Sequence, residues 1–226
     1  MMAVMPARQR RIPGSRDAAA ARTAILAAAI REFAQKGLAG ARMDAIAREA
    51  GVAKGLAFHH FGSKDGLWIA ALAEIYRTLR AGQDEAALDA LGPLEGMRRL
   101  TTDTFRLFRE NPEIVSLMNE ENLHRARHLK AAPDVRTLYN PLFGAIERLV
   151  KRGRIEGVFH RDVDVKTLYV ALSGLGYFYC SNRWTLSAAF ADDMSRPGSI
   201  AAYEKLIGDM VIAYLVNPAG AGPVRG

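Results

Sequence analysis

Apolar residues recur three and four positions apart along almost the whole chain, which is the pattern of helices that bury one face. Within residues 17–36, one stripe carries Ile25, Ile30 and Phe33, and Gly37 follows where a left-handed residue can end a helix. No segment alternates apolar and polar residues cleanly enough to predict a strand. The pattern therefore predicts an all-α fold of about nine helices.

Glycine, proline and capping residues divide this pattern into elements. Short helices are expected at 43–50 and 54–61, on either side of Gly51, and Ser63 can cap a fourth helix that reaches about residue 80. A linker-like stretch lies between Gly82 and Pro93. Beyond it, the sequence predicts helices at 94–111, 113–129, 133–153, 165–184 (capped by Asp164) and 199–216.

The helix expected at 165–184 lacks a charged face between Lys166 and Arg183. A helix that is apolar or small on every side must be covered on every side, so one face needs a partner subunit or a cavity. Ser173, Gly174 and Gly176 would let another helix approach closely. A central position in a large monomeric bundle is the alternative.

Positive charge is concentrated in the first third of the chain. Overall, 31 Lys and Arg face 24 Asp and Glu, but residues 1–70 hold 11 basic and 5 acidic side chains. This distribution is expected if the first third contacts a polyanion. A solvated basic tail is the alternative, because four arginines lie near the start: Arg8, Arg10, Arg11 and Arg16.

The cysteine content and the hydropathy of the chain indicate in which cellular compartment the protein is expected. Cys180 is the single cysteine, which excludes an internal disulfide and suits a reducing environment. The longest uncharged stretch, residues 167–182, falls short of the roughly 20 apolar residues that a membrane-spanning helix needs. We therefore expect a soluble cytoplasmic protein that does not associate with membranes.

Residues 43–61 contain two short helices around a glycine, the pattern of a helix-turn-helix. Gly51 can adopt the positive φ of a sharp turn, and the second helix can then enter a DNA major groove with its N-terminus first. Lys54 and Lys64 are the natural contacts for backbone phosphates.

The residues of this region also match a known family. The matching positions are Asp44-x-Ile46-Ala47-x-x-Ala50-Gly51-Val52-x-Lys54-Gly55 and Phe58-His59-His60-Phe61-x-Ser63-Lys64-x-x-Leu67. Together they closely resemble the DNA-binding domain of TetR-type transcriptional regulators. The resemblance implies a three-helix DNA-binding domain at 17–63 after a basic disordered tail at 1–16. It further implies a helical ligand-binding and dimerisation domain at 64–226, which would form a homodimer through the helices at 165–184 and 199–216.

The chain departs from the usual family pattern at four positions. Ala41 and Arg42 stand where Ser or Thr commonly caps the second helix, Leu56 replaces Thr or Ser, and Phe58 replaces Tyr. The expected DNA-contacting residues are Arg42, Lys54, Gly55, Leu56, Phe58, His59, His60 and Lys64. The alternative for three of these, Leu56, Phe58 and His60, is a place in the core of the small domain.

A set of aromatic and polar side chains in the second domain could line a small-molecule pocket, although such mixtures also suit ordinary cores. The candidates are Phe108, Met118, Glu121, Asn122, Phe143, Tyr177, Asn182 and Trp184. Three motifs, Asn111-Pro112-Glu113, Glu120-Glu121-Asn122 and Gly153-x-Ile155, give this domain a weak resemblance to regulators of nicotinate and pyrimidine catabolism. That resemblance implies a small aromatic acid as the effector.

Metal binding and catalysis have little support in the sequence. His124 and His128 lie four apart on the helix expected at 113–129, and Glu120 or Glu121 shares their side, so a divalent metal could be held there. Solvated histidines are the alternative, and with no fourth ligand we expect no metal and no cofactor. The chain has no Gly-x-Ser-x-Gly elbow, phosphate-binding loop, C-x-x-C or H-E-x-x-H motif, so we expect no enzyme.

These observations lead to one expectation and one alternative. We expect a ligand-responsive homodimeric regulator, a repressor that a small-molecule effector releases from a palindromic operator on double-stranded DNA. Two recognition helices fit successive major grooves only when held about 34–36 Å apart. The alternative is a sensor or interaction protein without a specific operator, because two hydroxyl groups that could contact DNA are missing.

Overall fold

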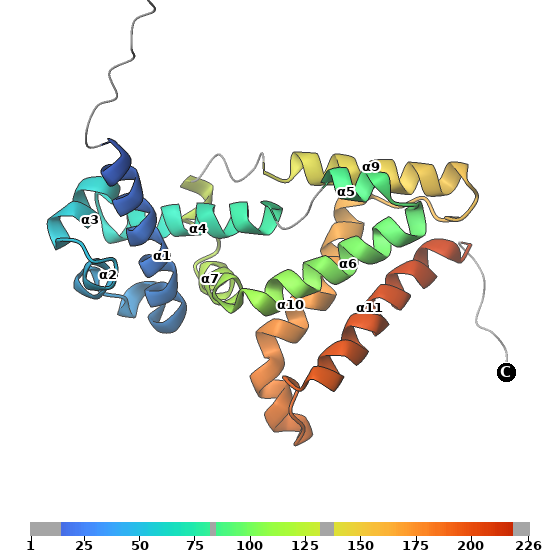
Figure 1. The fold of residues 1–226 in the computed structure, drawn as a ribbon. Coiled ribbons are helices and arrows are strands. Elements are labelled where there is room, and N and C mark those ends of the chain that lie inside the picture. Colours follow the sequence, from blue (N-terminus) through green and yellow to red (C-terminus); the bar gives the residue numbers. More distant parts are fainter. Residues whose placement is uncertain (1–14, 82–84, 132–137, 219–226) are drawn as a thin grey trace, which may run out of the picture. The chain divides into compact units, whose positions relative to one another are not determined.

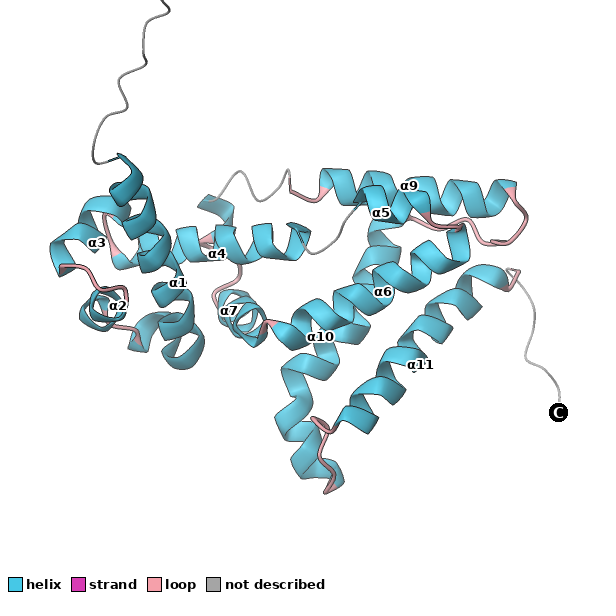
Figure 2. Cartoon of the chain, in the orientation of Figure 1, coloured by secondary structure: helices cyan, strands magenta, loops and turns pink. Residues whose placement is uncertain are grey.

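The computed structural model describes residues 15–81, 85–131 and 138–218, and all regular structure within these ranges is helical (Figure 2). The all-α prediction is confirmed. The α-helices are α1 (Ser15–Gly40), α2 (Met43–Glu49), α3 (Lys54–Phe61), α4 (Lys64–Ala81), α5 (Glu85–Ala90), α6 (Pro93–Glu110), α7 (Pro112–Leu123), α9 (Asn140–Ile155), α10 (Val165–Phe190) and α11 (Pro197–Val216), and a 3₁₀ turn, η1, spans Leu129–Ala131 (Figure 1).

The chain folds into two compact units, residues 1–71 and 72–226. The division falls within α4, which begins in the first unit and ends in the second. The sequence suggested a boundary after residue 63, at the start of this helix. Of the basic tail expected at 1–16, residues 1–14 lie outside the described part of the chain.

The first unit packs α1, α2, α3 and the start of α4 around one small core. Ile25, Ile46 and Trp68 are fully buried there, and the Phe33 ring meets the Trp68 ring edge to face with centroids 5.0 Å apart. Aromatic pairs in this geometry add about 0.5–1.5 kcal/mol to the free energy that burial itself contributes. The core therefore holds the short helices α2 and α3 in place.

Three local signals in the sequence are confirmed by the backbone. Gly37 has φ of 66° and interrupts α1 in the left-handed region that favours glycine. Ser63 Oγ accepts a hydrogen bond from the Gly66 N–H at 2.9 Å, and Asp164 accepts one from the Thr167 N–H at 2.8 Å. Both side chains thus cap the helices that follow them.

The second unit is built around α6, which packs against α9, α10 and α11. Its buried side chains include Met97 and Leu100, which join Ile146 of α9 and Leu172 of α10 in the main core. Gly96 lies directly against Leu149, and a Cβ atom there would come within 2.6 Å of that side chain. None of the described helices is long and apolar enough to cross a membrane.

A predicted linker and a predicted helix end in this unit are wrong. The stretch expected to be a linker contains α5, and α10 continues to Phe190 rather than ending near Trp184. The extra turns of α10 end at Ala191, which takes the left-handed conformation. The helix predicted to begin at Pro133 is described only from Asn140, as α9, because 132–137 lie outside the described residues.

The helix expected to reach residue 129 instead ends at Leu123. Arg125 and Ala126 have positive φ, and the N–H groups of His128 and Leu129 donate to one carboxylate oxygen of Glu121 at 2.8 and 3.0 Å. The buried Glu121 thus draws the chain back toward α7. A side chain that binds backbone groups in this way competes with continuation of the helix.

Candidate nucleic-acid interface and ligand-binding region

The predicted helix-turn-helix is formed by α2 and α3. Gly51 has φ of 69°, and the Val52 N–H donates to the Ala47 carbonyl at 3.0 Å, which closes the turn. Ile46 of α2 and Ala57 of α3 are fully buried between the helices. The turn therefore places α3 against α2. It favours glycine at position 51, because any L residue with this positive φ would be strained.

One face of α3 is open to solvent. Lys54, Gly55, Phe58 and His59 are all exposed, and on a helical projection they occupy one continuous arc, opposite the fully buried Ala57. The residue before the helix, Ala53, makes no side-chain cap, so the first backbone N–H groups keep their hydrogen-bonding capacity. An exposed helix N-terminus beside a lysine is the arrangement that suits contact with a DNA phosphate.

Two further predicted contact residues lie on the flank of α3. Leu56 and His60 are half-buried, and no described residue forms a hydrogen bond with the buried His60 Nε2. Phe58, by contrast, is 38% exposed. The core alternative therefore suits Leu56 and His60 better than it suits Phe58.

Lys54 is already engaged within the first unit. Its ammonium lies 2.5 Å from Asp44 Oδ1 of α2, and this contact holds the pKa of the Asp44 carboxyl below its usual range. Both side chains are 55% exposed, so solvent screens the pair and it contributes little to stability. The pair nevertheless places the Lys54 charge at the first turn of α3.

Lys64 supports the segment between α1 and α2. Its ammonium donates to the carbonyl oxygens of Ala39 and Ala41 at 3.2 and 3.3 Å, which leaves one of its three N–H groups for an outside acceptor. A phosphate contact by Lys64 would thus also tie the DNA to this segment.

Glu32 is a buried residue of α1, close to the start of α2, that the sequence analysis missed. Its carboxylate, 6% exposed, accepts the Arg42 N–H at 3.2 Å and binds the Lys36 ammonium at 2.9 Å. The bond to Lys36 lowers the pKa of Glu32 against the opposing effect of burial. This carboxylate supplies an acceptor near the start of α2, where Ala41 cannot. In the sequence, the charged residue directly before Phe33 on the buried stripe of α1 was the signal for this contact.

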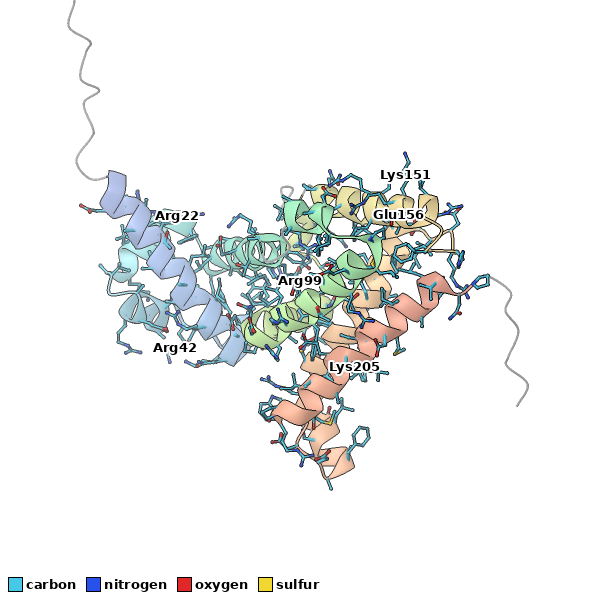
Figure 3. The ribbon with its side chains drawn as sticks, turned by 45° about the vertical axis from the view of Figure 1, so that its right-hand side comes forward. Arg22, Arg42, Arg99, Lys151, Glu156 and Lys205 are labelled. Atoms are coloured by element: carbon cyan, nitrogen blue, oxygen red, sulfur yellow. The ribbon has the colours of Figure 1, made fainter. Side chains whose placement is uncertain are left out.

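The side chain of Arg42, a predicted DNA-contacting residue, is exposed (Figure 3).

The structure brings some of the predicted ligand-binding residues together. The Phe108 and Tyr177 rings meet edge to face with centroids 5.6 Å apart, and the Tyr177 hydroxyl donates to Asn119. Burial raises the pKa of Tyr177, and a hydrogen bond with Asn122 opposes the effect. Met118 is half-buried on α7, the helix that also carries the buried Glu121.

Three other predicted ligand-binding residues lie elsewhere. Phe143 packs against Tyr169, with ring centroids 5.7 Å apart, in a separate aromatic cluster. The Asn182 side chain donates to the Phe178 carbonyl one turn earlier. Trp184 is 67% exposed on the outer face of α10, with the Arg183 guanidinium 4.7 Å from its ring centroid. With most of its surface exposed, Trp184 does not share the half-buried environment of Tyr177.

The aromatic cluster around Arg80 was not predicted. The guanidinium of Arg80, near the end of α4, lies 4.4 Å from the ring centroid of Tyr139, and its Nη2 donates to the Tyr169 hydroxyl at 2.8 Å. Burial raises the pKa of Tyr139 and of Tyr76, which lies one turn before Arg80. The sequence offered only one weak signal, a basic residue in register with the apolar stripe of Leu72, Ile75, Tyr76 and Leu79.

The premise of the metal-site hypothesis is wrong, because His124 and His128 do not share a helix. His128 Nδ1 lies 2.8 Å from Glu121 Oε2 in a buried pair, whereas His124 Nε2 lies 3.4 Å from Glu120 Oε1 near the surface. Within the described ranges, no group of three or more His, Cys, Asp or Glu side chains converges as a metal site would require.

The helices α10 and α11 carry many exposed apolar side chains. These are Val170 (69% exposed), Phe178 (57%), Trp184 (67%) and Phe190 (64%) on α10, and Leu206 (51%), Met210 (48%) and Tyr214 (49%) on α11. A groove between the two helices is lined by Val170, Gly174, Phe178, Met210 and Tyr214, among others. An added Cβ at Gly174 would meet no atom within 4 Å, so close approach from outside is open there. Large apolar surfaces of this kind mark interaction sites.

Comparison with known proteins agrees with this geometry. The sequence model of the family of bacterial regulatory proteins called tetR matches residues 25–71. The family model of the tetracyclin repressor-like C-terminal domain matches residues 93–211. The chain is 30% identical over 191 residues to the HTH-type transcriptional repressor NicS of Pseudomonas putida, covering 84% of this chain and 90% of that one. It is 31% identical over 143 residues to the HTH-type transcriptional regulator RutR of Escherichia coli, covering 62% and 67%.

Solved structures show the same fold. The TetR family transcriptional regulator PfmR from Thermus thermophilus superposes with a TM-score of 0.64 at 23% identity, covering 84% of this chain and 97% of that one. The transcriptional regulator FadR from Bacillus subtilis, solved with stearoyl-CoA, superposes with a TM-score of 0.65 at 16% identity, covering 86% and 99%.

Proposed function

The chain belongs to the TetR family of bacterial DNA-binding transcriptional regulators, and from this premise we propose that it is a homodimeric repressor that a small-molecule effector releases from a palindromic operator. In this role it acts in the cytoplasm, where chromosomal DNA is accessible. The observation that carries the DNA-binding part is the exposed arc of α3, which begins at the uncapped N-terminus of the helix.

Each predicted contact residue has a distinct role in this proposal. Lys54, Lys64 and Arg42 supply positive charge to phosphates. Gly55 faces open space and has no side chain, so the DNA backbone can come close to the helix there. Phe58 and His59 face the bases from the exposed arc, with apolar contact to thymine methyl groups and a hydrogen bond to a base edge as their respective chemistry. Leu56 and His60, which are half-buried, position the helix and contribute at its flank.

The dimer is proposed to form through the apolar face of α10 and α11. Val170, Phe178, Met210 and Tyr214 line the groove between these helices and are exposed in the single chain, and a second copy of the same face would cover them. Two-fold symmetry of the protein then calls for two-fold symmetry in the operator, with half-sites spaced by about one helical turn or a multiple of it.

Release is proposed to act through α4. This helix begins beside α3 in the sequence and ends in the second unit, so a ligand bound in the second unit can bias the helix that carries the DNA-binding domain. Only a ligand that binds the two states with different affinity can shift the equilibrium between them. No contact between ligand and DNA is needed.

Nuclease footprinting on the DNA that flanks the protein's own gene tests this function. We expect a protected palindrome with two equivalent half-sites, and a dimer in analytical ultracentrifugation under the same conditions. Salt-labile binding along the whole fragment would contradict a specific operator and favour a sensor or interaction protein. A protein that stays monomeric while it protects the palindrome would contradict the dimer.

A further inference from the structure

Arg80 is a cation whose hydrogen-bonding groups are largely unsatisfied. Its Nε and Nη1 atoms are buried and have no hydrogen-bond partner among the described residues, and within the same residues Nη2 alone is used, by the Tyr169 hydroxyl. Among the described residues, no carboxylate forms an ion pair with it. Arg77, one turn earlier on the same helix, differs in both respects, since it is exposed and forms an ion pair with Glu74.

Packing alone does not account for an arginine in this place. Burying guanidinium N–H groups without acceptors is unfavourable, and a methionine of similar length would fill the same space with no unsatisfied donor. The Tyr139 ring that covers the guanidinium face stabilises the cation but offers no acceptor in the guanidinium plane, where its N–H groups point. The arrangement therefore fits a site in which the acceptor arrives from outside the chain.

The surrounding side chains indicate the shape of the missing group. Tyr76, Tyr139, Phe143 and Tyr169 form one connected aromatic cluster, with neighbouring ring centroids 5.6 to 6.2 Å apart. Such walls favour a flat ring, which can stack on one side chain and meet the edges of others. The Tyr139 ring lies over the guanidinium, so binding of an external group there requires a change of the Tyr139 rotamer that uncovers the cation.

A second unsatisfied polar atom lies along the same face of α10. Ser173 follows Tyr169 by one turn and precedes Tyr177 by one turn, and its Oγ is buried with no hydrogen-bond partner in the part of the chain that the structure describes. A hydroxyl in this place can donate to a ring substituent or a ring nitrogen, as orienting groups in small-molecule sites do.

From these observations we propose that Arg80 anchors an effector site for a small aromatic monocarboxylate. The carboxylate would accept hydrogen bonds from Nη2 and from one of the two orphaned nitrogens, the ring would pack among the tyrosines, and the Ser173 hydroxyl would orient the ring. One guanidinium neutralises one negative charge, whereas a phosphate dianion would leave an uncompensated charge among the aromatic rings. The inference rests on the proposed function, because it identifies the effector class and the site through which it acts.

Isothermal titration calorimetry on the full chain tests the site with matched probes. The probes are benzoate and pyridine-3-carboxylate, each paired with its neutral amide of nearly the same shape. We expect the carboxylates to bind and the amides to bind at least about tenfold more weakly, since only the carboxylates carry charge-assisted acceptors. In Arg80→Met, carboxylate affinity should fall by about tenfold to a hundredfold. Arg77→Met is the matched control and should bind as the unmodified chain does.

Several results would overturn the proposal. They are no binding of either carboxylate at millimolar concentration, equal affinity for carboxylate and amide, or an unchanged affinity in Arg80→Met. If Arg80→Met does not fold, the preference of the unmodified chain for carboxylate over amide still tests the proposed carboxylate site. Ser173→Ala is a smaller change and should weaken carboxylate binding severalfold. Operator footprinting without any carboxylate is independent of these results. A protected palindrome with no carboxylate binding overturns only the effector site, and carboxylate binding without a palindrome overturns only the proposed DNA-binding function.

Discussion

The ammonium of Lys54, at the first turn of α3, lies 2.5 Å from the carboxylate of Asp44, at the first turn of α2. The pair joins the two helices of the helix-turn-helix across their exposed ends. Because both side chains are half exposed and screened by water, a DNA phosphate can compete with Asp44 for the lysine. The Asp44 contact therefore holds Lys54 at the proposed interface, and replacing it by a contact with a DNA phosphate costs little free energy.

Replacing Lys54 by methionine should weaken operator binding similarly for all operator sequences. A phosphate contact contributes about 0.9 to the slope of log affinity against log salt concentration, so the slope should fall by about that amount. Fluorescence anisotropy at several salt concentrations measures it. Lys151→Met, an exposed lysine on α9, is the control and should leave the slope unchanged. An unchanged slope in Lys54→Met would contradict the phosphate contact.

Replacing Asp44 by asparagine should have the opposite effect. The change removes a negative charge that repels phosphate and releases Lys54, whose contact now keeps the pKa of Asp44 low and the carboxylate ionised at neutral pH. We expect tighter binding to operator and to unrelated DNA alike, by about twofold to tenfold at low salt. The same anisotropy assay measures both. Tighter binding to the operator alone would indicate that Asp44 takes part in base recognition instead.

Charge introduced on the apolar face of α10 and α11 should separate the proposed dimer. Phe178 is 57% exposed and lines the groove between these helices. An aspartate in its place would be buried and unpaired in a dimer, and we expect the dissociation constant to rise by about a hundredfold or more. Sedimentation velocity measures it.

Ile155→Asp is the matched control for this prediction. Ile155 is 76% exposed but lies at the end of α9, outside the proposed interface. It should leave the dimer intact. Equal dissociation of both variants would show a general effect on folding, and an unchanged dimer in Phe178→Asp would place the interface elsewhere.

The features that the sequence predicted are those set by neighbouring residues. The turn at Gly51, the left-handed Gly37 and the caps at Ser63 and Asp164 each depend on contacts within about four positions, which the residue types alone indicate. The exposed arc of α3 follows from helical periodicity in the same way.

The features that were missed depend on contacts between distant residues. Tyr169, which binds Arg80, is 89 positions away, and Glu121 ends α7 through N–H groups seven and eight positions ahead. Helical spacing contains no information about such partners. Trp184 shows a related limit of prediction from sequence. An aromatic side chain suits a cavity as well as a surface, and only the structure shows that Trp184 is exposed.

Replacing Glu121 by alanine should strongly destabilise the second unit. Its carboxylate is 4% exposed, accepts the N–H groups of His128 and Leu129, and lies 2.8 Å from the His128 ring. Removal leaves these buried donors without this acceptor, so we expect the free energy of unfolding to fall by about 2–4 kcal/mol. Urea denaturation followed by circular dichroism measures it. Glu147→Ala, an exposed residue on α9, should stay within about 0.5 kcal/mol. A similarly small loss in Glu121→Ala would mean that the turn after α7 is held by other contacts.

Cys180 should react slowly with thiol reagents in the folded protein. Burial raises the pKa of its thiol to about 11, with Arg183 and Arg109 opposing the shift only in part. The thiolate is the reactive form, so at pH 8 only about one thiol in a thousand is poised to react, against about one in four for an ordinary cysteine of pKa 8.5. The rate should rise about tenfold for each pH unit between 8 and 10, because the thiolate fraction grows in proportion to hydroxide over that range. Stopped-flow measurement with a disulfide reagent provides the profile, and the same chain in urea, where burial is lost, should level off above pH 9. A folded-state rate that levels off near pH 9 would show that Cys180 is solvated and that its surroundings on α10 are more open than this structure has them.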